Sequence, residues 1–79
     1  MKLLVRNLAR NITEKEIKIL FSECGTVQSC DLVLDKITAK SKGFAFVEMP
    51  NIKEATAAIK TLNGKVLANQ TIRVKTAEN

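Results

Sequence analysis

Apolar positions along the chain fall into short runs separated by polar segments, and the spacing within each run predicts its structure. The first run, Leu3 to Leu8, is too short for a helix and predicts a strand. Thr13 followed by Glu16 is a capping-box pattern. Apolar residues at helical spacing then predict a helix from Thr13 to Cys24, which Gly25 ends.

The middle of the chain predicts two strands joined by a polar arm. β-Branched and apolar residues indicate a strand from Thr26 to Asp35, and the basic segment from Asp35 to Lys42 is typical of a loop. A run of apolar and aromatic residues from Gly43 to Met49 predicts the next strand. Pro50 closes that strand, because a proline has no N–H to donate to a sheet.

The last third of the chain predicts a second helix and a final strand. Asn51 with Glu54 repeats the capping pattern, and an apolar stripe continues to Asn63-Gly64. A short hairpin and a strand follow, containing Val66, Leu67, Ile72 and Val74. The order strand, helix, strand, strand, helix, strand predicts an α+β, ferredoxin-like β-α-β-β-α-β sandwich. Its four-stranded antiparallel sheet would carry both helices on one face.

Composition limits the size, class and location of the protein. The 79 residues suffice for one small domain, which we expect to span 1–79 and to be monomeric. An apolar fraction of 46% with 27% charged residues is typical of a globular chain. No stretch approaches the roughly 20 apolar residues of a membrane span. The N-terminal segment lacks the pattern of a secretory signal, so we expect a cytoplasmic location.

The cysteine and histidine content argues against a catalytic or metal site. Without histidine, the serine and cysteine triad chemistries are excluded, and an enzyme would depend on carboxylates or lysines. Cys24 and Cys30 could hold zinc only with carboxylates or a second chain, so we interpret them as reduced thiols near the core. A copper chaperone would need a cysteine pair in the loop Leu8–Ile12, which has none. We therefore expect neither catalysis nor a cofactor.

The third predicted strand carries the functional motif. The segment Lys42-Gly43-Phe44-Ala45-Phe46-Val47-Glu48-Met49 matches the ribonucleoprotein octamer K/R-G-F/Y-G/A-F-V-x-F/Y except at its last position. Average composition makes such a match by chance about one in 100,000. The companion hexamer resembles Leu3-Leu4-Val5-Arg6-Asn7-Leu8. Over essentially its whole length the chain resembles the RNA-recognition-motif family, and its compact form resembles the small stand-alone members found in bacteria.

This resemblance implies non-catalytic binding of single-stranded RNA, with single-stranded DNA as a second candidate ligand, on the open face of the sheet. Alternation along the third strand turns one set of side chains toward the helices: Ala45, Val47 and Met49. The other set lies on the open face: Phe44, Phe46 and Glu48. Two neighbouring exposed aromatic rings favour a partner with flat apolar faces, such as unpaired bases.

Alternation along the other strands predicts further residues of the RNA-binding surface: Lys2, Leu4, Arg6, Asp31, Val33, Arg73 and Lys75. The family position adds Lys42, and the basic loop before the motif adds Lys40 as an auxiliary phosphate contact. In the family, the Lys42 position pairs with a backbone phosphate. Leu4 replaces a usual stacking aromatic, which predicts an affinity about 5- to 150-fold below that of a three-aromatic relative. Met49 replaces an aromatic on the buried side, where its thioether can fill the space.

The net charge of +5 favours a polyanionic partner but is modest for a nucleic-acid binder. The alternative function is a protein-interaction module that docks a peptide on the open sheet or on the helices. Other proteins with the same plan are enzymes or metal carriers, and the fold alone does not separate these classes.

Overall fold

The computed structural model describes residues 1–77. The elements follow in the order β1 (Lys2–Arg6), α1 (Glu14–Ser22), β2 (Ser29–Leu34), β3 (Ser41–Glu48), α2 (Ile52–Leu62), β4 (Val66–Leu67), β5 (Gln70–Thr71) and β6 (Arg73–Thr76). Strands β2, β3, β1 and β6 form an antiparallel sheet in that order, and β4 pairs with β5 in a separate hairpin. The predicted ferredoxin-like fold is confirmed.

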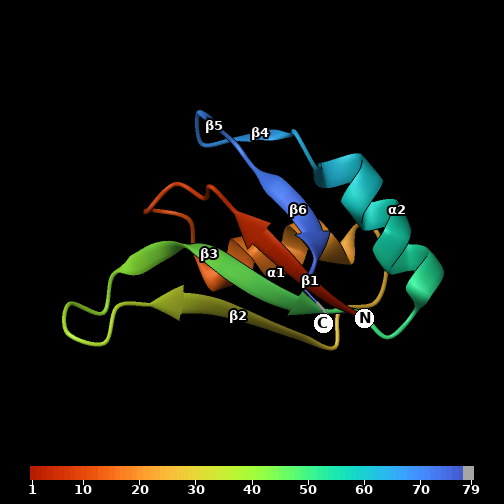
Figure 1. Cartoon of the computed structure of the whole chain (residues 1–79), viewed down its shortest axis with the longest axis horizontal. Coiled ribbons are helices and arrows are strands. Elements are labelled where there is room, and N and C mark those ends of the chain that lie inside the picture. The colour runs from red at the N-terminus through yellow and green to blue at the C-terminus, as the bar shows by residue number, and fades with distance from the viewer. Residues whose placement is uncertain (78–79) are drawn as a thin grey trace.

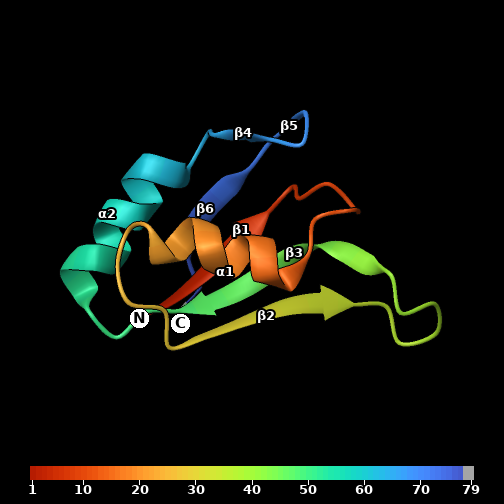
Figure 2. The same cartoon turned by 180° about the vertical axis from the view of Figure 1, so that it is seen from behind.

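Both helices cover the same side of this sheet. In Figure 1 the strands lie in front of α1, and in the view from behind α1 crosses in front of the strands (Figure 2). The central strands β3 and β1 therefore have one face against the helices and one face that no helix covers.

The core lies between the sheet and the helices. Alternate residues of the central strands are buried on that side: Leu3, Val5, Ala45, Val47 and Met49. From the helices they meet Ile17, Phe21, Ala55, Ala58 and Leu62, which are also buried. Met49 is fully buried, as its place in the motif predicts. The prediction that these alternate residues of β3 and β1 point toward the helices is confirmed, so the residues between them must lie on the uncovered face.

The helix starts follow the predicted caps. Thr13 Oγ1 accepts a hydrogen bond from the Glu16 N–H at 3.2 Å, and Asn51 Oδ1 accepts one from the Glu54 N–H at 3.1 Å. Each cap therefore satisfies one of the backbone donors that a helix N-terminus leaves unpaired. Helix α1 nevertheless ends at Ser22, two residues before the predicted end at Cys24.

Several strand boundaries differ from the predicted ones, and contacts between distant segments explain two of the differences. Strand β1 ends at Arg6 because Asn7 adopts a left-handed conformation with φ of 60°, and Leu8 resumes pairing through its N–H to the Gly43 carbonyl at 2.9 Å. Strand β2 begins at Ser29, because the Thr26 N–H donates to Glu54 Oε1 at 3.0 Å instead of to the sheet. Strand β3 begins two residues early, at Ser41.

The two cysteines are free thiols that pack against the edge of the core. Within residues 1–77, no group of three or more histidine, cysteine, aspartate or glutamate side chains is placed to hold a metal ion. Neither helix in the described part of the chain combines the length and the hydropathy needed to cross a membrane.

Candidate nucleic-acid interface

The uncovered face of the sheet is organised in rows that run across the strands. In an antiparallel sheet, directly paired residues project their side chains to the same face, with Cβ atoms about 4.5 to 5.5 Å apart. Phe46 pairs with Leu4 on one side and with Asp31 on the other, and Leu4 pairs in turn with Lys75. One row therefore reads Asp31, Phe46, Leu4, Lys75, from strand β2 to strand β6.

A second row contains the other aromatic ring of the motif. The β1–β3 register runs as far as Val5 and Ala45, and its extension by one residue would put Arg6 beside Phe44. Arg6 then pairs directly with Arg73 on β6. The register between β2 and β3 shifts after Leu32, so no paired β2 residue extends this row beyond Phe44.

The two phenylalanine rings lie together on this face, as predicted. Their centroids are 6.1 Å apart and their planes are nearly perpendicular, at 89°. Edge-to-face contact is a favoured geometry for an aromatic pair. Both rings are partly buried by their neighbours rather than fully exposed. Because the rings are perpendicular, two bases cannot stack on both as on one flat platform unless a ring rotates or the bases tilt.

A lysine ammonium covers one of the rings. Lys2 Nζ lies 4.7 Å from the centroid of the Phe46 ring, within the range of a cation–π interaction. At an exposed site such a contact is worth about 0.5 to 1 kcal/mol. A base that stacks on this side of Phe46 would have to displace the ammonium.

The remaining predicted residues of the surface have contrasting surroundings. Arg6, Arg73, Lys75 and Asp31 are exposed, while Leu4 and Val33 are partly buried. Glu48 lies 3.8 Å from the N-terminal ammonium of Met1, so its carboxylate is partly neutralised. No hydrogen bond or ion pair involves Asp31 in the part of the chain that the structure describes.

The β2–β3 arm holds its basic residues in a defined turn. Asp35 Oδ1 accepts hydrogen bonds from the N–H groups of Ile37 and Thr38 at 2.8 and 3.0 Å. The Thr38 and Ile37 bonds, and then the charge of Lys42, lower the pKa of the Asp35 carboxyl. Lys42 is exposed and lies directly before Gly43, at the start of the motif strand.

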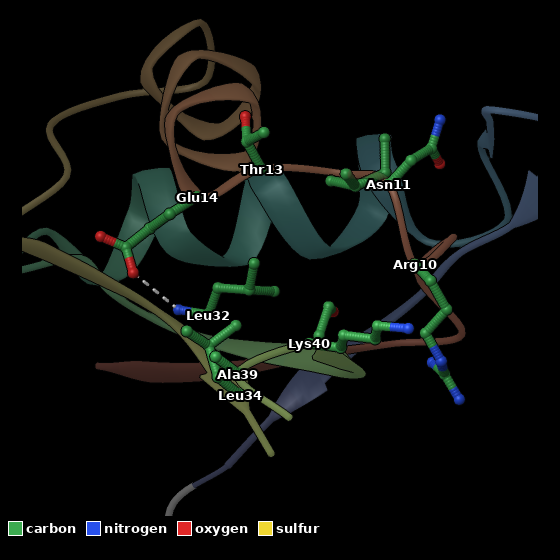
Figure 3. A pocket seen from close by; sticks show the side chains of 10 residues that line it. Arg10, Asn11, Thr13, Glu14, Leu32, Leu34, Ala39 and Lys40 are labelled. Carbon is green, nitrogen blue, oxygen red and sulfur yellow. Dashed lines mark hydrogen bonds between the residues drawn. The ribbon is translucent and has the colours of Figure 1, made fainter. Parts of the chain in front are cut away.

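The structure places Lys40 away from the aromatic rings, and its predicted role as an auxiliary phosphate contact stays a prediction. Lys40 lines a shallow pocket on the helix side of the sheet, together with Arg10, Ile12, Leu32, Leu34 and Ala39 (Figure 3). At the other end of this pocket, Glu14 Oε2 accepts a hydrogen bond from the Leu32 N–H at 3.0 Å. Lys40 follows Ala39, whose φ of 61° turns the chain there.

Two residues that support the surface were not predicted. Asn7 joins the end of β1 to the β4–β5 hairpin, because its Nδ2 donates to the Thr71 carbonyl at 2.7 Å and its own carbonyl accepts from Gln70 Nε2 at 3.1 Å. Arg10 lies over Gly43, at the start of the motif. Asparagine is enriched in the left-handed conformation, so Asn7 directly after a strand was the available signal. The position of Arg10 left no sequence signal.

Comparison with known proteins agrees with this geometry. The sequence model described as the RNA recognition motif matches residues 3–73. RNA recognition domains 1 and 2 of Sex-lethal from Drosophila melanogaster are 32% identical with a TM-score of 0.94; the alignment covers 99% of this chain and 50% of that one. RNA Binding Protein PG1 is 32% identical with a TM-score of 0.96, and the alignment covers 100% of this chain and 95% of that chain.

A third similar structure contains a ligand. The RRM of Rna15, solved with bound RNA (GU), is 27% identical with a TM-score of 0.89, and the alignment covers 99% of this chain and 83% of that chain. The present chain therefore spans about half of the Sex-lethal structure but most of the PG1 and Rna15 structures.

Proposed function

Since the chain belongs to the RNA recognition motif family, we propose that it binds single-stranded RNA on the uncovered face of the sheet and catalyses no reaction. The observation that carries this proposal is the pair Phe44 and Phe46, which lie 6.1 Å apart on that face and are bordered by cationic side chains. Aromatic rings beside cations provide stacking surfaces for bases and contacts for phosphates.

The arginine pair on the second row supports a phosphate contact. Arg6 and Arg73 are directly opposite on neighbouring strands, both are exposed, and within residues 1–77 neither forms a salt bridge. Like charges in that arrangement destabilise a sheet. A phosphate between the two guanidinium groups would turn this repulsion into two attractive contacts, next to the base on Phe44. Lys42 and Lys75 extend the positive border on either side.

The expected affinity is moderate. Two stacked bases supply about 2 to 6 kcal/mol, while a micromolar complex needs about 8 kcal/mol. Displacement of Lys2 from Phe46 and the replacement of an aromatic by Leu4 both reduce the stacking contribution. Phosphate contacts must supply the difference, so binding should weaken as salt concentration rises, by a slope of about 0.7 per phosphate contact on a double-logarithmic plot.

The same proposal includes the finer expectations. The backbone-tracking cations and stacking rings do not require a 2′-hydroxyl, so single-stranded DNA is a further ligand. The protein acts as a monomer in the cytoplasm, where its free thiols stay reduced. Size measurement by light scattering and fractionation of cells test these two points.

The test is a double substitution, Phe44→Ala with Phe46→Ala, and a short random single-stranded RNA as ligand. Loss of two stacking surfaces should lower the affinity at least about 30-fold, the equivalent of 2 kcal/mol. A matched control removes two exposed isoleucines from the helices, Ile19→Ala with Ile52→Ala, whose side chains are 54% and 68% exposed. The control should bind like wild type.

Backbone amide chemical shifts monitor both folding and the site. In wild type, addition of RNA at low salt should shift the amides of β1 and β3, while amides on the outer sides of the helices stay in place. Wild-type affinity in a folded double variant would refute the assigned site. An absence of shifts on the sheet, with shifts on addition of a candidate peptide, would favour the protein-interaction alternative.

A further inference from the structure

One carboxylate on the uncovered face, Asp31, has no hydrogen-bond or ion-pair partner among residues 1–77. Asp31 pairs with Phe46 across β2 and β3, so its side chain projects beside that ring. It is exposed, and the structure of residues 1–77 gives it neither a hydrogen bond nor an ion pair. Glu48, the other acidic residue on this face, is instead 3.8 Å from the Met1 ammonium. Among the described residues, Asp31 is thus a carboxylate on this face that remains available to a ligand.

Its position is unexpected for a surface that only attracts phosphate. The other end of the same row is the cationic Lys75, and the neighbouring row carries Arg6 and Arg73. A phosphate near Asp31 would be repelled, so the RNA backbone should run on the β1–β6 side of the rings. The base that stacks on Phe46 would then point the edge bearing its hydrogen-bonding groups toward Asp31.

The chemistry of a carboxylate then restricts that base. An ionised carboxylate only accepts hydrogen bonds. Cytosine and adenine each present an exocyclic amino group, and guanine presents an amino group beside a ring N–H, which matches the two oxygens of a carboxylate. Uracil has a single ring N–H between two carbonyl oxygens, and these oxygens are repelled by the negative charge.

On this basis we propose that Asp31 selects the base stacked on Phe46, favouring amino-bearing bases over uracil. The proposal rests on the proposed RNA-binding function and adds base selectivity at one position of its site. The position over Phe44 lacks this selectivity, because its neighbour Arg6 donates hydrogen bonds. Discrimination should therefore be confined to one nucleotide of the bound segment.

The test compares hexamers of cytidine and uridine, which differ only where cytosine carries its amino group and the adjacent ring nitrogen. A bidentate hydrogen-bonded pair between a side chain and a base edge discriminates by about 5- to 150-fold, and a contact to a single amino group should lie toward the low end of this range. Wild type should prefer the cytidine hexamer within that range. In Asp31→Ala the preference should fall to near unity, with uridine binding unchanged or tighter.

The control separates a specific contact from the effect of charge. Glu23→Gln removes one negative charge from an exposed residue at the end of α1, as Asp31→Asn does on the sheet face. The Glu23 variant should bind both hexamers slightly more tightly and keep the cytidine preference, while Asp31→Asn should reduce it. If both variants behave alike, Asp31 is only a general charge and the proposal fails.

Failure of the two proposals can be told apart. Equal wild-type binding of the two hexamers, abolished by Phe44→Ala with Phe46→Ala, would overturn the role of Asp31 and leave RNA binding intact. If wild type binds neither hexamer at low salt, both proposals are overturned.

Discussion

Gly43 offers a test of whether a motif residue serves the fold or the ligand. Its φ of +85° lies in the left-handed region, and it is buried at the start of the motif strand. A methyl group at this position would collide with the Arg10 guanidinium and approach the Leu8 carbonyl oxygen to 3.2 Å. We therefore predict that Gly43→Ala destabilises the protein.

The magnitude follows from which of these conflicts can relax. Arg10 is exposed and its guanidinium ends a flexible side chain, so it can swing away at little cost. The backbone cannot, because the Leu8 N–H donates to the Gly43 carbonyl at 2.9 Å and holds the two strands together. A left-handed conformation costs a non-glycine residue about 1 to 2 kcal/mol. That loss is a large part of the free energy of unfolding, which is about 5 kcal/mol for the least stable small domains.

Urea denaturation followed by circular dichroism measures this effect in four proteins: wild type, Gly43→Ala, Arg10→Ala and the double variant. Gly43→Ala should lose about 1 to 2 kcal/mol in either background, with a coupling energy below about 0.5 kcal/mol. At urea concentrations at which Gly43→Ala is folded, its RNA affinity should equal that of wild type. Stability restored by Arg10→Ala would show that the side-chain collision, and not the backbone conformation, sets the requirement for glycine.

Two further predictions concern the helix cap and a thiol. Thr13→Ala should lower the free energy of unfolding by about 1 kcal/mol, because the Glu16 N–H loses its acceptor, and Thr13→Ser should restore it in the same urea assay. Burial, and then the charges of Glu14 and Asp31, raise the pKa of the Cys30 thiol from 9.0 to about 11. The contribution of the Cys30 thiol to the free energy of unfolding should thus be complete below pH 9 and be lost as the pH rises to 11. The Cys30→Ala variant should not show this loss. Alkylation of Cys30 that reached half its maximal rate near pH 9 would contradict the raised pKa.

The parts of this structure that follow a simple period could be predicted from the sequence. Alternation along Gly43–Met49 depends only on the strand repeat of two, so it assigned Phe44 and Phe46 to the uncovered face correctly. Likewise the caps at Thr13 and Asn51 depend on residues three positions apart in the chain.

The errors occurred where a contact between distant segments decides the local structure. The N–H of Thr26 is taken by Glu54, which lies 28 positions away, and this delays the start of β2. Strand β1 ends before Leu8, whose N–H pairs with the carbonyl of Gly43, 35 positions away. Such contacts have no period, so propensity and spacing cannot reveal them.

In the proposed complex, the cross-strand rows would let a protein with a net charge of only +5 orient a nucleic acid. Total charge controls the attraction of a polyanion, but the order of groups within a row controls which part of the nucleotide lies where. The row through Phe46 has a carboxylate at its β2 end and an ammonium at its β6 end. Turning the nucleotide around would put its phosphate against Asp31 and its base edge against Lys75. The sheet register therefore favours one orientation, and exchanging these charges as Asp31→Lys with Lys75→Asp would favour the other at an unchanged net charge.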